Sequence, residues 1–252
     1  MLGGALVVVA TGFLLAANAV LDPSTAADTE GPGPTTVGAR PSDDARGAAA
    51  RPAPTRVPLT PEPTTAPEAP AAMQTMINIM EDGRPDHSRA TQRRLYLLAR
   101  EHSTEKLDDE GAEPEGWAAG LGLLGYGSYA VHVEDTRKDA IRTAARALRL
   151  TGRPVGLLTW RGAHSWVMSG FEATADPAYT DRFTVTHVYI EDVWYPRISS
   201  IWGESRPPDA RVPVDLLPED YLPWDRPRVR QPDKDGRFVL VVPVLAEGAA
   251  PG

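Results

Sequence analysis

Hydrophobic residues in the middle of the chain recur with the 3.6-residue period of an α-helix. In each of these stretches they gather on one face, which is typical of a helix that covers a core. Ser88 is a capping-type residue before one stretch, Asp135 is expected to cap another, and Gly152 follows the end of that one. The predicted helices cover residues 69–80, 88–100, 117–124 and 137–150.

After residue 152 the pattern changes to short runs of β-branched and aromatic residues. Gly, Pro and Asp separate these runs, as they do between the strands of a sheet. Helices first and strands afterwards indicate an α+β fold, in which an N-terminal helical layer packs on one side of a C-terminal antiparallel sheet. The predicted strands cover residues 154–160, 164–171, 182–191 and 237–244.

The N-terminal residues 2–21 carry no charged side chain. At about 1.5 Å per residue, a helix of this length crosses a bilayer core of about 30 Å. We therefore expect a transmembrane anchor, or alternatively a cleaved signal peptide, because residues 17–19 (Ala-Asn-Ala) supply a small-x-small site. The next basic residue is Arg40, so no positive charge holds the domain in the cytoplasm. The domain is expected outside the cell membrane or secreted.

Residues 22–67 are rich in Pro, Ala, Thr and Gly, a composition that favours an extended, disordered linker over a packed element. Such a linker would hold a folded domain away from the membrane. The predicted organisation is a membrane or signal segment at 1–21, a linker at 22–67, one domain at 68–246 and a flexible tail at 247–252.

Composition excludes several classes of function. A net charge of -8 and a pI near 5.2 argue against nucleic acid, which is bound through clustered Lys and Arg. The absence of cysteine excludes disulfides, thiolate metal sites and iron–sulfur clusters. Abundant Ala, Gly, Pro and Arg are typical of a bacterial protein from a GC-rich genome, and nothing in the sequence points to a cofactor.

The order of elements resembles a known family. A buried first helix, a helical middle, and then strands that carry RGAHSWVMSGF and EDVWYPRISSIWG resemble the papain-like peptidase fold, specifically the bacteriocin-processing (double-glycine leader) peptidases and their exported relatives. In that family a cysteine begins the first helix, a histidine starts a central strand, and an Asp or Asn follows the next strand. The resemblance assigns these positions to Glu68, within a residue or two, to His164 and to Asp192.

The cysteine is therefore missing from the position that matters most. In this chemistry the imidazole takes the thiol proton, the carboxylate fixes the ring tautomer, and the thiolate attacks from a helix N-terminus. Glu68 would be stabilised at a helix start and could pair with His164, but a carboxylate is a poor acyl-transfer nucleophile. We expect a non-catalytic pseudopeptidase that binds a peptide, a protein or a cell-envelope component.

Aromatic residues near these positions are candidates for binding. Trp194 and Trp202 lie in irregular segments, and the resemblance places both beside His164 and Asp192. Trp166, two residues after His164, completes the predicted binding set. The competing interpretation is that the aromatic residues pin long loops onto the sheet.

The main alternative is an active hydrolase of peptide or amide bonds that uses His164 and Asp192 with a non-cysteine nucleophile or a metal. Ser165 would face away from His164 on a strand, and the other candidate hydroxyls, Thr64 and Thr65, lie in the Pro-rich linker. These positions make a hydroxyl nucleophile the weaker hypothesis.

Two further interpretations stay open. His187 and Glu191 are four residues apart on one strand, hence on one face and near Asp192, where a metal site is conceivable although the spacing is not a recognised ligand pattern. The protein could also be a purely structural envelope protein, in which His164 and Asp192 affect stability alone.

Overall fold

The computed structural model describes residues 7–10, 68–81, 83–104, 112–226 and 231–245. The α-helices are α1 (Glu68–Met80), α2 (Arg89–Glu101), α3 (Pro114–Leu123) and α4 (Arg137–Thr151), with 3-10 helices η1 (Trp160–Gly162) and η2 (Val214–Glu219). The strands are β1 (Val7–Ala10), β2 (Tyr129–Glu134), β3 (Val155–Thr159), β4 (His164–Ala173), β5 (Val185–Asp192), β6 (Ile198–Ser199), β7 (Gly203–Glu204), β8 (Ala210–Pro213) and β9 (Phe238–Pro243).

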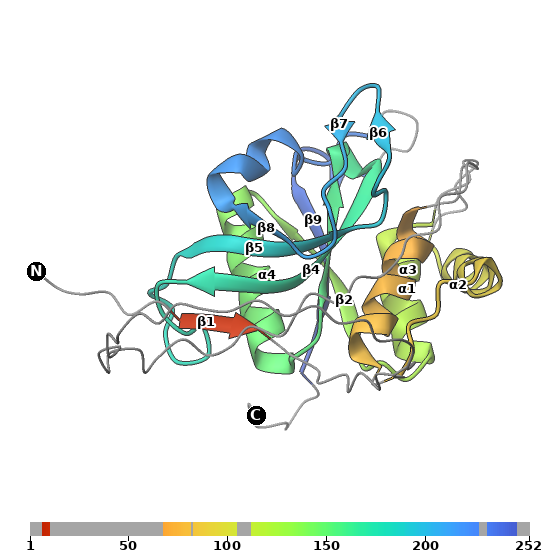
Figure 1. Ribbon diagram of the computed structural model, residues 1–252, viewed down its shortest axis with the longest axis horizontal. Helices are drawn as coiled ribbons and strands as arrows, with labels where there is room; N and C mark the ends of the chain where they lie inside the picture. The colour runs from red at the N-terminus through yellow and green to blue at the C-terminus, as the bar shows by residue number, and fades with distance from the viewer. Residues whose placement is uncertain (1–6, 11–67, 82, 105–111, 227–230, 246–252) are drawn as a thin grey trace, which may run out of the picture.

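The main sheet has the strand order β2-β9-β3-β4-β5-β8, and β1 pairs with the C-terminal part of β4 (Figure 1). Every strand pair among the described residues is antiparallel. Strands β6 and β7 form a separate hairpin that projects from the body. The predicted α+β class with an antiparallel sheet is confirmed.

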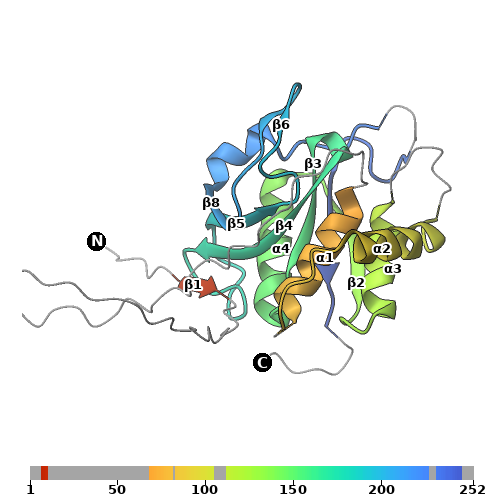
Figure 2. The ribbon, with the colours of Figure 1, turned by 45° about the vertical axis from the view of Figure 1, so that its right-hand side comes forward.

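Helices cover both faces of this sheet, not one as expected (Figure 2). On β9, Phe238 and Leu240 belong to the core under α4, whereas Val239 and Val241 belong to the core under α1, α2 and α3. Consecutive apolar residues on β9 give the strand two hydrophobic faces, and each must be covered.

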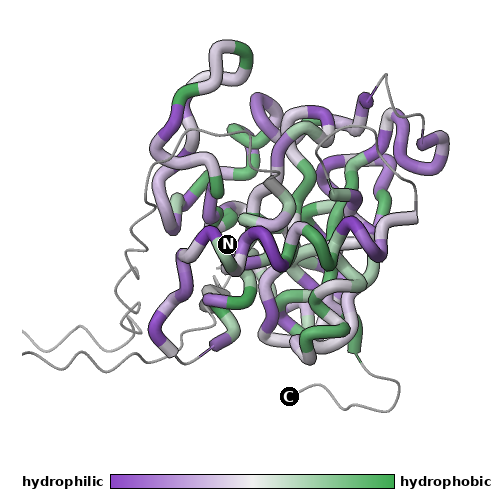
Figure 3. Tube along the Cα trace, turned by 90° about the vertical axis from the view of Figure 1, so that its right-hand side faces the viewer, coloured by the Kyte–Doolittle hydropathy of each residue, from purple (hydrophilic) through white to green (hydrophobic). Residues whose placement is uncertain are grey.

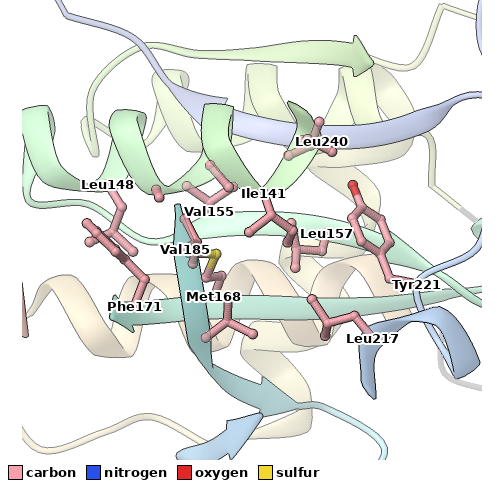
Figure 4. Close-up of a cluster of buried hydrophobic side chains, with 14 of the residues drawn as sticks. Ile141, Leu148, Val155, Leu157, Met168, Phe171, Val185, Leu217, Tyr221 and Leu240 are labelled. Atoms are coloured by element: carbon pink, nitrogen blue, oxygen red, sulfur yellow. The ribbon is translucent and has the colours of Figure 1, made fainter. Parts of the chain in front are cut away.

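The core under α4 is built from aliphatic and aromatic side chains of the helix and the central strands (Figure 4). Ile141 and Leu148 of α4 face Leu157 of β3, Met168 of β4 and Leu240 of β9, and none of the five is more than 1% exposed. Burying a side chain of this size stabilises a fold by about 1.5–3 kcal/mol. This packing fixes β3, β4 and β9 relative to one another.

The N-cap of α4 is Thr136, so the expectation of Asp135 is wrong. The Thr136 hydroxyl accepts a hydrogen bond from the Asp139 backbone N–H at 3.1 Å, whereas the Asp135 carboxylate accepts from Arg237 Nε at 2.7 Å. Gly152 ends the helix in the left-handed region, at φ 67°, as the sequence predicted. Ser88 caps α2 through a hydrogen bond from the Thr91 N–H, as predicted.

Helix α1 runs alongside β4 and begins at the end of the sheet where β3 turns into β4. Its last residue, Met80, lies beside the Tyr129 hydroxyl at 3.5 Å, and that hydroxyl donates to the Pro154 carbonyl just before β3. Thirteen helical residues span about 20 Å and the five residues of β3 span about 17 Å. Helix α1 therefore begins toward the end of the sheet that carries His164.

Strand β4 contains one extra residue relative to β5. Met168 pairs with Ile190 and Gly170 pairs with Tyr189, so Ser169 between them forms a β-bulge. Beyond the bulge, Phe171 faces the core under α4. The neighbouring Glu172 faces the other side of the sheet.

Glu172 is the centre of a polar cluster on that side. Its carboxylate accepts two hydrogen bonds from Arg211 at 2.7 Å and one from the Tyr189 hydroxyl at 2.8 Å. The hydrogen bond from Arg211 is the main reason that the pKa of Glu172 lies at about 2. The cluster ties β4, β5 and β8 together away from the apolar core.

Several predicted segments fall largely outside the described residues. Of residues 1–21, the structure describes only Val7–Ala10, which form β1, and the linker at 22–67 and the tail at 247–252 are outside it. No helix within the described ranges is long and apolar enough to cross a membrane. Strands β1, β2, β6, β7 and β8 were not predicted, and β1 lies within the segment expected to be a membrane anchor or signal peptide.

The packing of α3 on β3 gives the first testable prediction. A Cβ atom added at Gly156 would overlap the buried ring of Trp117, which lies directly over that glycine. Gly156→Ala should therefore lower the free energy of unfolding by about 1–3 kcal/mol, measured by urea denaturation. The control is Gly83→Ala, where nothing lies within 4 Å of the added atom and a change below about 0.5 kcal/mol is expected. Equal stability of the two variants would contradict the described contact.

Candidate functional site

The structure brings His164 and Asp192 together at one end of the sheet. His164 is the first residue of β4 and Asp192 the last residue of β5, where it pairs with Trp166. His164 Nε2 lies 2.7 Å from Asp192 Oδ1, and both side chains are 0% exposed. The two residues are diagonal neighbours on one face of the sheet, a geometry that long side chains can bridge.

Asp192 accepts two more hydrogen bonds, both from backbone N–H groups of the loop that follows β5. Its Oδ1 atom accepts from Trp194 N at 3.0 Å, and its Oδ2 atom accepts from Arg206 N at 3.0 Å. Burial alone would raise the pKa of this carboxyl, but the hydrogen bonds from His164 and from the two backbone groups lower it overall. Asp192 is therefore a buried anion.

The charge on Asp192 determines the role of each ring nitrogen of His164. An ionised carboxylate can only accept hydrogen bonds, so Nε2 carries a proton and donates it. The ring nitrogen that could take up a proton is then Nδ1. Asp192 thus fixes the tautomer and the orientation of the imidazole, the role that an orienting acid plays beside a general base.

One tryptophan ring covers a face of the imidazole, and a second tryptophan stacks on the first. The Trp160 ring stacks on His164 with centroids 3.9 Å apart, and Trp202 stacks on Trp160 with centroids 6.0 Å apart. Trp160 and Arg161 both have positive φ angles, 49° and 60°, in the turn between β3 and β4. Left-handed conformations cost about 1–2 kcal/mol per residue for side chains other than glycine. Other contacts must therefore hold this turn in place.

Asp220 supplies these contacts. Its backbone carbonyl accepts from Trp160 N at 2.9 Å, and its Oδ1 atom accepts from the Trp160 indole at 3.4 Å. Its Oδ2 atom pairs with the Arg206 guanidinium at 2.6 Å, and that guanidinium lies 5.5 Å from the Trp166 ring centroid. A closed ring of contacts from His164 through Asp192, Arg206 and Asp220 to Trp160 encloses the site.

The other predicted site residues lie in different surroundings. Trp166 is 1% exposed and belongs to the core under α4, so it does not line the surface of the domain. Trp194 and Trp202 are both half-buried. The Arg197 guanidinium lies 4.7 Å from the Trp194 ring centroid. Glu68 is the first residue of α1, at the same end of the sheet as His164, and its side chain is outside the described part.

Side chains alternate between the two faces of β4, so His164 and helix α1 lie on opposite faces of the sheet. His164 faces the same side as Trp166, whereas α1 packs on the opposite side, against Val167. A contact between His164 and the start of α1 must therefore pass beyond the end of the strands. Ser165 faces away from His164, as expected for the next residue on a strand.

The residues considered for a metal are not brought together. No group of three or more His, Asp or Glu side chains is placed to hold a metal ion within the residues that the structure describes. His187 and Glu191 lie on the face opposite Asp192; His187 Nδ1 lies 3.2 Å from Glu172, and Glu191 accepts from the Asp209 N–H. These contacts belong to the surface of the sheet.

Sequence reasoning missed Trp160, Arg206 and Asp220. Trp160 carried a usable signal, because an aromatic residue followed by Arg-Gly at the end of a strand marks a tight turn beside His164. Arg206 and Asp220 lie in irregular segments, and their pairing follows from tertiary structure alone.

Comparison with known proteins finds no relative of this chain. It matches no protein-family model, no curated protein and no solved structure. The functional argument therefore rests on the residues and contacts described above.

Asp192 gives the second prediction. In Asp192→Asn an amide replaces the carboxylate where three donors converge, so at least one buried donor loses its acceptor, and the free energy of unfolding should fall by about 1–3 kcal/mol at pH 7. The control is Asp135→Asn, which changes a side chain that is 83% exposed and should have little effect.

The same carboxyl gives the stability a pH dependence. Because folding lowers the pKa of Asp192, its contribution is fully present above the ordinary pKa of 3.8 and is lost as pH falls through the lower folded-state value. Urea unfolding between about pH 5 and pH 2.5 should show a smaller loss of stability on acidification in Asp192→Asn than in the natural protein. Parallel curves would show that folding does not change the pKa of Asp192, and a larger loss in Asp192→Asn than in the natural protein would show that folding raises it.

Proposed function

We propose that this protein is an exported, membrane-tethered papain-like domain without its nucleophilic cysteine, which acts as a non-catalytic binding module for peptides. One observation carries the proposal: the His164–Asp192 pair is fully buried in a chain with no cysteine. The pair corresponds to the base and the orienting acid of the resemblance, whereas the attacking group has no counterpart. The geometry for orienting a histidine is retained without the means to form an acyl-enzyme.

The surroundings of His164 favour a structural role for the pair. A general base must come within hydrogen-bond reach of the proton it takes, about 2.6–3.2 Å. The Trp160 ring covers the His164 ring at 3.9 Å, and the contacts of Asp220 hold Trp160 in that position. Because the His164 side chain is 0% exposed, a substrate could reach its ring nitrogen only after the surrounding residues move, so catalysis is the less favoured function.

The loop from 193 to 206 is the proposed binding element. Asp192 holds both of its ends through Trp194 N and Arg206 N, so the loop is ordered before a ligand arrives. Trp194 and Trp202 are half-buried and keep part of each ring open to solvent. Rigid aromatic rings with Arg197 beside them suit a peptide that offers an apolar side chain and a carboxylate.

Tethering and export rest on the N-terminal sequence. The lack of charge at 2–21 supports a membrane or signal segment, and the composition of 22–67 supports a linker from there to α1. Val7–Ala10 of that segment pair with β4 in the structure, so membrane insertion would require this pairing to be released. The binding element would then work at the outer surface of a cell, where peptides and envelope components are its available ligands.

Binding without turnover is the third prediction. The probe is a panel of fluorescent octapeptides with apolar residues and a free C-terminal carboxylate, measured by anisotropy. Trp194→Ala and Trp202→Ala should each raise the Kd roughly tenfold or more, because buried aromatic anchors carry most of the affinity of a site. Tyr179→Ala, at a side chain 83% exposed in another loop, should leave the Kd unchanged.

Mass spectrometry of the same mixtures tests for cleavage, and no product is expected. Hydrolysis that disappears in His164→Ala would overturn the proposal and favour the active hydrolase. Affinity that is equal in the natural protein and in both tryptophan variants would remove the binding site from the 193–206 loop.

The relation to cysteine peptidases gives the fourth prediction. Because the chain has no cysteine, a single introduced thiol can be followed without background. Cysteine is placed at Ala66, Pro67, Glu68 or Ala69, each with and without His164→Ala, and labelling by an electrophilic thiol probe is timed. One position should react roughly tenfold faster than a free thiol at neutral pH, because a nearby imidazole and a helix N-terminus lower the thiol pKa.

His164→Ala should remove that advantage. If none of the four thiols is activated, the resemblance does not extend to the site, and His164 with Asp192 serves stability alone. If activation survives His164→Ala, the helix N-terminus and not the histidine is its cause, and the same conclusion follows for His164.

A further inference from the structure

The second half of β4 extends beyond its neighbour β3. The first residue of β3, Val155, pairs with Met168, and residues 170–173 of β4 continue past it. These four residues are buried, and hydrophobic stretches of the chain run mostly through the interior of the domain (Figure 3). Buried main-chain N–H and C=O groups must find hydrogen-bond partners. This edge of β4 therefore requires a strand other than β3.

Strand β1 fills that place. Val7 pairs with Ala173 and Ala10 pairs with Gly170, in an antiparallel register that is unbroken over four residues. Strand β1 lies beside this end of β4 in both Figure 1 and Figure 2. The two strands are far apart in the sequence, so the pairing does not depend on a connecting turn. The edge accepts a short extended segment that is held by its main chain.

The paired residues indicate which peptides this edge accepts. Gly170 and Ala173 have small side chains at the two ends of the register. The carboxylate of Glu172, which lies between them, is already bound by the Arg211 guanidinium, so it does not require a basic residue in the added strand. The segment that occupies the edge is Val-Val-Val-Ala, which has no charge and favours the extended conformation. An extended apolar peptide fits this edge.

Residues 7–10 have a second expected location. They belong to the segment 2–21, which is expected to enter a membrane or to be cleaved as a signal peptide. They cannot pair with β4 and cross a bilayer at the same time. When they leave, the main-chain edge of a buried strand is exposed, which is unfavourable until another strand is added. This release rests on the membrane or signal segment of the proposed function, whereas the edge itself rests on the strand pairing.

We propose that the edge of β4 at residues 170–173 is a strand-addition site for an extended apolar peptide of another chain, which residues 7–10 occupy in the structure as an internal competitor. The site lies at the end of β4 opposite His164, so it is separate from the 193–206 loop. A competitor in the same chain acts at an effective concentration of up to about 1 mM. The peptide therefore binds weakly until residues 7–10 leave.

The test uses the full chain and a fluorescent peptide with the sequence of residues 5–12, extended by two lysines for solubility. The variant carries Val8→Pro and Val9→Pro. Because N–H groups alternate in direction along a strand, one of these two substitutions removes an N–H that faces β4, and β1 is released. Anisotropy should give a Kd at least roughly tenfold lower for this variant than for the natural chain.

The control peptide has N-methyl groups on the residues equivalent to Val8 and Val9. It keeps the apolar side chains but lacks the main-chain donors, so it should bind neither chain. Equal Kd values for the natural chain and the proline variant would overturn the proposal, and so would binding of the methylated peptide.

Disulfide trapping tests the register. Ala173→Cys gives the chain a single thiol, and the peptide carries either Val7→Cys or Val8→Cys in a glutathione buffer that contains the oxidised form. Val7 is opposite Ala173, so the Val7→Cys peptide should be trapped at least roughly tenfold faster than the Val8→Cys peptide, whose thiol faces the other side of the strand. Equal rates would place the peptide elsewhere and contradict the site.

Trapping is also measured with Ala173→Cys in a chain that keeps Val8 and Val9, where it should be slower with the same preference. If the proline variant no longer unfolds cooperatively in urea, this measurement decides, and no trapping overturns the proposal. If light scattering finds the natural chain dimeric and the proline variant monomeric, a second copy is the occupant and a separate peptide is wrong. Trp202→Ala should leave binding at β4 unchanged, which distinguishes this site from the 193–206 loop.

Discussion

One buried carboxylate organises the end of the sheet where the site lies. Asp192 accepts from His164, from Trp194 N and from Arg206 N, and through these bonds it joins β4 to both ends of the 193–206 loop. A buried charge is tolerated only where donors replace the water it has lost. The orientation of the imidazole and the position of the 193–206 loop, with its hairpin, therefore both follow from the need of the Asp192 carboxylate for hydrogen-bond donors.

Trp160, which stacks on the imidazole, is held by contacts that also involve the 193–206 loop. The left-handed turn at Trp160 and Arg161 is unfavourable by itself, and Asp220 stabilises it through the Trp160 backbone and indole while it pairs with Arg206. A catalytic base needs access, whereas this histidine is stacked, oriented and enclosed. The arrangement suits a site that holds a surface in shape, and the surface it holds is the loop with the half-buried tryptophans.

More of the fold than of the site could be predicted from the sequence. Helical periods and apolar runs located the helices and the central strands, and the continuous apolar run of β9 already implied two covered faces, although one was expected. Strand β2 was missed despite the alternation of Tyr129, Val131 and Val133, because it lies between two helices. Proximity of His164 and Asp192 followed from the resemblance. Contacts between irregular segments, such as Arg206 with Asp220, have no periodic signal.

The bulge in β4 has a consequence for how this domain can change over generations. Ser169 shifts the strand by one position, so that Phe171 enters the core and Glu172 reaches Arg211 on the opposite face. Losing the codon for Ser169 would only remove the bulge, because Met168 and Gly170 already pair with the consecutive residues Ile190 and Tyr189. Losing the codon for Val167, a regularly paired position, would instead move His164 and Trp166 to the opposite face of the sheet. Insertions and deletions of one codon are commonly tolerated in surface loops. In β4 a one-codon insertion or deletion at a regularly paired position changes the face that the neighbouring side chains occupy, which a substitution does not do. The positions of insertions and deletions in β4 are therefore constrained separately from the identities of its residues.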